Sequence, residues 1–124
     1  MKKQAIKELA DEFAAVLPPE HESFFRNLVP SFCCGDYFFS HAGVKPGTPL
    51  EQQSEDDLLW IRDEFIEFEG TFAKIIVHGH TPAAAVEQKP NRINVDTGAY
   101  ATGVLSTVVL EGTSIRVLDT SKQT

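Results

Sequence analysis

The sequence has little cysteine and no basis for a disulfide framework. Its two cysteines, Cys33 and Cys34, are adjacent, and neighbours in sequence almost never form a stable bridge. A chain without disulfides is typical of a reducing compartment, so we expect a cytoplasmic protein. No basic residue lies close to the pair in sequence, and we expect both thiols to be buried and inert.

Basic residues are also scarce. Eleven Lys and Arg stand against eighteen Asp and Glu, which gives a formal net charge of −7, and only Lys2 and Lys3 are adjacent. A basic stripe is typical of nucleic-acid binders and of proteins that dock on anionic membranes, so we expect neither partner. No apolar run approaches the ~18 residues of a spanning helix, and the charged start is unlike a signal peptide.

Three nucleotide and hydrolase motifs are absent. The sequence contains no GxxxxGK phosphate loop, no GxGxxG dinucleotide fingerprint and no GxSxG elbow. The chemistry of this chain therefore has to come from other residues.

The first forty residues predict two helices and a strand. With 124 residues, of which 42% are hydrophobic, the chain has the length of one domain. Apolar residues at three- and four-residue steps predict a helix over 2–17, with a stripe of Ile6, Leu9, Phe13 and Val16. A second helix is expected from Pro19 towards Pro30. The apolar run Asp36–Ser40 predicts a buried strand.

The rest of the chain predicts one long helix and four extended segments. Ser54 can cap a helix whose acidic first turn suits the dipole and which continues to Gly70. The extended segments are 73–77, 91–96, 104–111 and 114–119, the last two joined by a turn at Glu111-Gly112-Thr113. Two N-terminal helices followed by strands and one long helix indicate an α+β fold.

Histidines follow two of the predicted strands. His41 precedes Ala42-Gly43, and His80 closes the run His78-Gly79-His80. Ligands collect at the carboxyl ends of strands, and neutral imidazole is the commonest protein metal ligand. A metal site needs more than two ligands, and His78, Asp96 and Asp36 are the candidates for the remainder. The alternative is that these are structural histidines, and that Asp96 shapes a turn.

Arg62 is the one basic residue in the apolar segment 58–65. A guanidinium there either extends to water, with an ion pair to a nearby acid, or binds an anion. Phosphate is apt, because guanidinium grips it bidentately.

Taken in order, four motifs resemble a known family. They are FFSHAGVKPG (38–47), LLWIRDEF (58–65), VHGHTP (77–82) and RINVDTGAY (92–100). Together they resemble the C-terminal half of a bacterial PPP-type serine/threonine protein phosphatase, of the calcineurin-like metallophosphoesterase superfamily. The resemblance covers roughly residues 17–119 and implies half of a four-layer αββα sandwich with a mixed sheet.

The resemblance also implies roles for residues. The family hydrolyses phosphoesters with a water activated by two divalent metal ions, manganese, iron or zinc. By resemblance His41 and His80 are ligands of one metal, and Arg62 contacts the substrate phosphate. His78 and Asp96 are carried over only as supporting residues. The implied substrates are phosphoproteins.

The family's DxH, GDxxDRG and GNHE motifs do not occur in this sequence. We therefore expect residues 1–124 to be a single partial domain with an incomplete metal site, inactive by itself. Two alternatives within this reading are a dinucleoside polyphosphate hydrolase and a non-catalytic remnant that forms homo-oligomers through an exposed sheet edge. A third is a compact mononuclear metal-binding domain that uses His41, His78, His80 and Asp96.

Overall fold

A computed structural model describes residues 2–121. A mixed five-stranded sheet forms its centre, in the order β1-β2-β3-β5-β4. The strands are β1 (Ser31–Cys34), β2 (Tyr37–Ser40), β3 (Ile75–His78), β4 (Glu87–Gln88) and β5 (Arg92–Asn94). β2, β3 and β5 run parallel, and the two edge strands, β1 and β4, are antiparallel to their neighbours. The predicted α+β class is confirmed.

A separate hairpin follows the sheet. The last two strands, β6 (Ser106–Glu111) and β7 (Ser114–Asp119), pair antiparallel as predicted. Gly112 takes a φ of 58° in the connecting turn, a conformation that glycine adopts at little cost. Its carbonyl accepts a hydrogen bond from the Tyr37 hydroxyl at 3.4 Å. The other end of the hairpin is held by Thr97, whose Oγ1 donates to the Val104 carbonyl at 2.8 Å.

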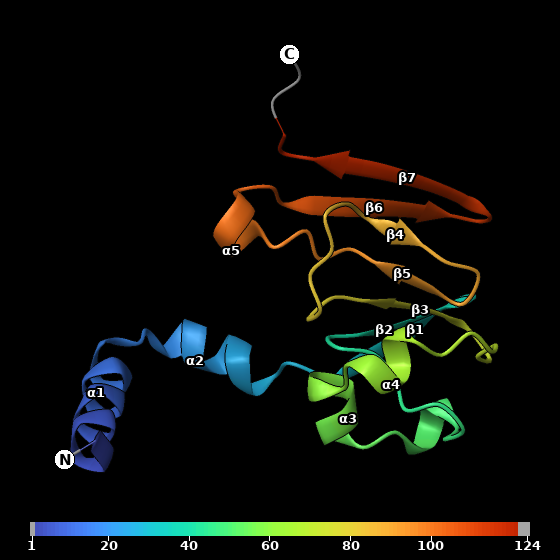
Figure 1. Cartoon of the computed structure of the whole chain (residues 1–124). Helices are drawn as coiled ribbons and strands as arrows, with labels where there is room; N and C mark the ends of the chain where they lie inside the picture. The colour runs from blue at the N-terminus through green and yellow to red at the C-terminus, as the bar shows by residue number, and fades with distance from the viewer. Residues whose placement is uncertain (1, 122–124) are drawn as a thin grey trace.

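Both N-terminal helices form where the sequence predicts them, but they bury nothing. α1 (Lys2–Val16) and α2 (Pro19–Arg26) contain no buried residue, and Figure 1 shows them extending away from the sheet. The apolar stripe of α1 is 58–75% exposed. A stripe of this kind is the face that a helix normally packs against a neighbour, and residues 2–121 provide no such neighbour.

The predicted long helix is wrong. The segment forms two short helices, α3 (Glu55–Trp60) and α4 (Asp63–Ile66), after a 3₁₀ turn, η1 (Leu50–Gln52). Arg62 lies between them with φ −129° and ψ −108°. In a continuous helix Arg62 would stand four residues after Leu58 and three before Phe65, on the buried face. The break keeps Leu58 and Phe65 buried and leaves the arginine exposed.

The hydrophobic core lies between the sheet and these short helices. Its buried members are Phe38, Ala42, Val44, Leu58, Ile61, Phe65 and Ile76. Ser54 caps α3 as predicted, accepting the Asp57 amide at 3.1 Å. The Ala42 amide donates to the Leu58 carbonyl at 2.8 Å and ties α3 to the segment that follows β2.

Sequence reasoning missed three elements. β1 and β4 were not expected, and the Asp96–Ala99 turn continues into a short helix, α5 (Ala99–Thr102). The burial predicted for Cys33 and Cys34 is wrong, since both are exposed. They lie on the edge strand β1, which has only β2 as a neighbour. None of the helices in residues 2–121 has the length and apolar character needed to cross a bilayer.

Gly43 provides a test of this core. An added Cβ there would lie 2.2 Å from Phe65 Cδ1, at a φ of 143°. Gly43→Ala should therefore lower the free energy of unfolding by about 3 kcal/mol, through overpacking and backbone strain together. Gly47→Ala is the matched control, because Gly47 also has positive φ (83°) but nothing within 4 Å, and should cost only about 1 kcal/mol. Equal losses in urea denaturation would contradict this packing.

Candidate active site

His41 and His80 meet at the carboxyl edge of the sheet. His41 follows β2 directly, and His80 follows the neighbouring parallel strand β3 by two residues. His41 Nε2 lies 3.0 Å from His80 Nδ1, and the ring centroids are 4.9 Å apart at 65°. The structure thus brings together the two histidines that the sequence singles out.

Gly79 connects the two segments. Its amide donates to the His41 carbonyl at 2.8 Å. An added Cβ on Gly79 would lie 3.3 Å from the Asp96 Cβ and 3.5 Å from its Oδ2. The glycine therefore lets the segment after β5 approach the histidine pair closely.

His80 has an unusual backbone conformation. It is the one residue other than glycine with positive φ, at 69°, in the described part of the chain. The Thr81 amide donates to the Gly79 carbonyl at 2.8 Å, which closes a three-residue γ-turn around His80. The γ-turn with positive φ is rare and strained. Strain of this kind persists only where the surroundings hold it, and it clusters at functional sites.

The surroundings of His80 favour the neutral form of its imidazole. Partial burial lowers the pKa of His80 below its ordinary value of 6.5, the positive charges of Arg62 and His41 lower it further, and Asp96 opposes them. Arg62, although exposed, is thus close enough to act on His80 electrostatically. His80 Nε2 is buried and has no hydrogen-bond partner within residues 2–121. The indole of Trp60, which sequence reasoning did not select, stands edge-on to the His80 ring at 5.7 Å.

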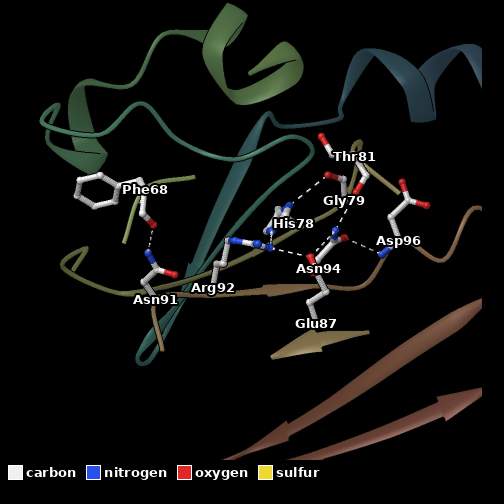
Figure 2. Close-up of polar contacts among 9 residues, drawn as sticks. All are labelled: Phe68, His78, Gly79, Thr81, Glu87, Asn91, Arg92, Asn94 and Asp96. Carbon is white, nitrogen blue, oxygen red and sulfur yellow. Dashed lines mark hydrogen bonds and ion pairs between the residues drawn. The ribbon is translucent and has the colours of Figure 1, made fainter. Parts of the chain in front are cut away.

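The structure does not bring His78 into this pair. Its side chain is 2% exposed, and both ring nitrogens have protein partners. Nδ1 lies 3.1 Å from the Gly79 carbonyl and Nε2 lies 3.3 Å from Arg92 Nη1 (Figure 2). Because a guanidinium only donates, Nε2 accepts and Nδ1 carries the proton. Burial lowers the pKa of His78 to about 4, with the Arg92 charge as a smaller contribution in the same direction.

Asp96 lies beside the pair, and Asp36 does not. The Asp96 side chain accepts the Gly98 amide at 2.9 Å, which is the turn-shaping role that the sequence also allowed. Asp36 precedes β2 and therefore lies at the opposite end of that strand from His41. Within residues 2–121, no group of three or more His, Cys, Asp or Glu is placed to hold a metal ion.

The histidine pair fits part of a metal site. Two nitrogens that bind a tetrahedral zinc ion at about 2.0–2.1 Å lie about 3.3 Å apart. The observed separation of 3.0 Å is close to that value and is also the length of a hydrogen bond between the two rings. Two ligands are fewer than a catalytic zinc site uses. The donors present are therefore the right kind and spacing, but not the full number.

A cavity of about 560 Å³ adjoins the pair. Its apolar walls include Phe39 and Val77 from the sheet, and Val104 and Leu105 before the hairpin, whereas His41, His80 and Asp96 supply polar groups. Small-molecule sites are commonly concave and mostly apolar, with a few convergent polar groups. The size and lining fit such a site.

The low pKa of His78 predicts a specific acid sensitivity. The unfolded chain binds the proton near pH 6.5 and the folded protein only near pH 4. Stability is therefore complete above pH 6.5 and is lost as the pH falls towards 4, by up to about 3 kcal/mol. In urea denaturation, the free energy of unfolding of His78→Asn should fall by about 3 kcal/mol less between pH 7 and 4 than that of the unchanged chain. The exposed His21 provides the control His21→Asn, which should follow the unchanged chain; identical profiles for all three proteins would contradict the assignment.

Comparison with known proteins gives one informative likeness. No family model matches this sequence, and no curated protein matches it. Among solved structures, it is similar to one described as "Crystal structure of a putative diadenosine tetraphosphatase", with a TM-score of 0.68 at 22% identity. The match covers 94% of this chain and 62% of that chain. The likeness establishes the fold: the mixed α+β arrangement of this chain corresponds to part of that structure.

Proposed function

We propose that this chain supplies part of the active site of a metal-dependent phosphoester hydrolase. The observation that carries the proposal is the separation of 3.0 Å between His41 Nε2 and His80 Nδ1, with the Arg62 charge acting on His80. Metal-dependent phosphoester hydrolysis uses these two elements, metal ligands and a cation that binds the phosphate.

His41 and His80 would hold a divalent ion through ring nitrogens. The lowering of the His80 pKa by burial and by Arg62 suits this role, because only a neutral imidazole offers a lone pair to a metal. An ion bound there would supply a Lewis acid and a more acidic water.

Arg62 would bind the phosphoryl group. Its guanidinium can donate two parallel hydrogen bonds to phosphate oxygens and offset the charge that develops as the ester bond breaks. Its position in the break between α3 and α4 leaves the side chain free to do so. Trp60 would form an apolar wall beside His80.

The remaining ligands would come from polypeptide outside residues 1–124. Two histidines do not complete a site, and this chain spans 62% of the length of the solved structure that it resembles. In this proposal the whole site holds two ions of manganese, iron or zinc, and these residues form one partial domain of it.

Phosphoproteins are the substrates that the motifs favour. Dinucleoside polyphosphates are the second candidate, because the solved structure with the same fold is described as a "putative diadenosine tetraphosphatase". Both contain the phosphoryl group that Arg62 would bind. Comparing hydrolysis of a phosphoserine peptide and of diadenosine tetraphosphate, by any longer polypeptide that contains these residues, separates the two.

A non-catalytic role in association remains a proposal of a different class. The edge strand β1 has one paired side, and Phe32 on it is 61% exposed. An unpaired strand edge is a template for pairing with a second copy. A strictly monomeric chain in sedimentation velocity, at all concentrations tested, would contradict it.

Metal binding tests the histidine pair. His80→Ala should weaken Zn²⁺ binding in calorimetry by at least about tenfold, because loss even of residues that only support ligands typically costs 10–100-fold. His21→Ala removes an exposed histidine on α2 and should leave the affinity unchanged. Equal affinities for the unchanged chain and for His80→Ala would overturn the proposed site.

Phosphate binding tests Arg62. Arg62→Ala should weaken binding of inorganic phosphate, in the presence of Zn²⁺, by about tenfold to a hundredfold, which is the worth of a charge-assisted hydrogen bond. Arg116→Ala is the matched control, since Arg116 is an exposed arginine on β7. The phosphate signal in ³¹P NMR titrations reports both affinities, and an equal effect of the two substitutions would count against a role for Arg62.

A further inference from the structure

We infer that His78 and Asn94 are positioning residues that clamp the strained turn around His80 and so aim its ring at His41. The inference rests on the proposed function only in one respect, that His41 and His80 bind a divalent metal ion. The geometry of the clamp belongs to the chain itself.

The clamp holds both carbonyls that flank His80. His78 Nδ1 lies 3.1 Å from the Gly79 carbonyl, which precedes His80 in the chain, and donates to it. The Asn94 amide donates to the carbonyl of Thr81, which follows His80, at 2.8 Å. Figure 2 shows the two side chains reaching these carbonyls from the neighbouring strands β3 and β5.

The two clamping side chains are themselves fixed. His78 is 2% and Asn94 1% exposed, and they are partners in the register of β3 and β5. Arg92 Nη1 lies 3.3 Å from His78 Nε2 and 3.1 Å from Glu87 Oε1. This chain of contacts, buried except at Glu87, holds the His78 tautomer that donates to Gly79.

Asn94 extends the clamp to the segment after β5, which carries Asp96. Its Oδ1 accepts the Asp96 amide at 3.0 Å. One buried amide thus links the turn that presents His80 with the segment that carries Asp96. Buried polar networks of this kind fix geometry when every member is satisfied.

A non-glycine residue at a φ of 69° needs such support, because outside the turn the extended and right-handed regions are lower in energy. If the Gly79 and Thr81 carbonyls were released, the turn could relax, and His80 Nδ1 would leave the position 3.0 Å from His41 Nε2. The clamp therefore acts on the site through His80, without contact of its own with substrate or metal.

Two matched variants of His78 separate its contacts. In His78→Asn the amide nitrogen takes the place of Nδ1 and keeps the donor to Gly79. In His78→Gln the amide oxygen takes the place of Nε2 and keeps the acceptor for Arg92, but the donor is lost. Zn²⁺ affinity should fall about 10–100-fold in His78→Gln and stay within about threefold in His78→Asn, well under the tenfold that 1.4 kcal/mol represents.

Asn94→Asp is the second test. It keeps an oxygen for the Asp96 amide and loses the donor to Thr81, so Zn²⁺ affinity should again fall about 10–100-fold. Asn91→Asp is its control. Asn91 starts the same strand segment and donates to the Phe68 and Gly70 carbonyls at 2.8 and 2.9 Å, away from the site. It should lower stability but leave Zn²⁺ affinity within about threefold.

A metal-free measurement makes the clamp testable separately from the proposed function. A strong intraresidue amide–Hα NOE marks positive φ, and ring ¹⁵N shifts mark the histidine tautomers. The unchanged chain should show positive φ at His80 and a proton on His78 Nδ1. The NOE should weaken in His78→Gln and persist in His78→Asn.

The outcomes are distinct. If the unchanged chain lacks positive φ at His80 or carries the other His78 tautomer, the clamp is wrong, and this result needs no variant to fold. If the variants change the NOE as expected but the unchanged chain binds no Zn²⁺, the clamp stands and the proposed function fails. If Zn²⁺ binds and His78→Gln behaves as His78→Asn does, the proposed function stands and the clamp fails.

Discussion

The parallel pairing of β2, β3 and β5 is the constraint on which the rest of this structure depends. Parallel neighbours end at the same edge of a sheet. Phe39 is paired with Val77, and His78 with Asn94. These registers place the residues that follow the three strands close together in space. The site is a consequence of that register, because a slip by one residue would turn His78 and Asn94 to the other face of the sheet.

Close approach at this edge depends on two glycines. Gly43 leaves room for the Phe65 ring, and that ring in turn stands edge-on to the His78 ring at 4.7 Å. Gly79 leaves room for Asp96. Because His78 follows the core residue Ile76 by two positions in β3, its side chain lies on the core face of the sheet. The core thus packs directly against the polar contacts that hold the turn.

The sequence alone predicted the α+β class, both N-terminal helices and the hairpin, and the resemblance to a known family singled out His41 and His80 as a pair. Each follows from local signals: apolar periodicity, strand ends and turn residues. It did not predict the break at Arg62, because the run from Leu58 to Phe65 has helical spacing throughout. The break arises because Leu58 and Phe65 are buried against the sheet while Arg62 stays exposed. β1 and β4 were missed because such short strands form only through hydrogen bonds to the neighbouring strand, which leave no pattern in the local sequence. The role of Asn94, a polar residue within the buried strand β5, depends on a partner thirteen residues away.

The unburied α1 has a thermodynamic consequence. An isolated helix of 15 residues is marginal in water even with good helix formers, because nucleation costs more than a few turns return. Whatever covers the stripe of Ile6, Leu9, Phe13 and Val16 would supply much of the free energy that keeps α1 helical. Helix formation and association then become one linked equilibrium, with the heat-capacity change of coupled folding and binding. The helicity of residues 2–16 would in this way report whether the stripe is covered.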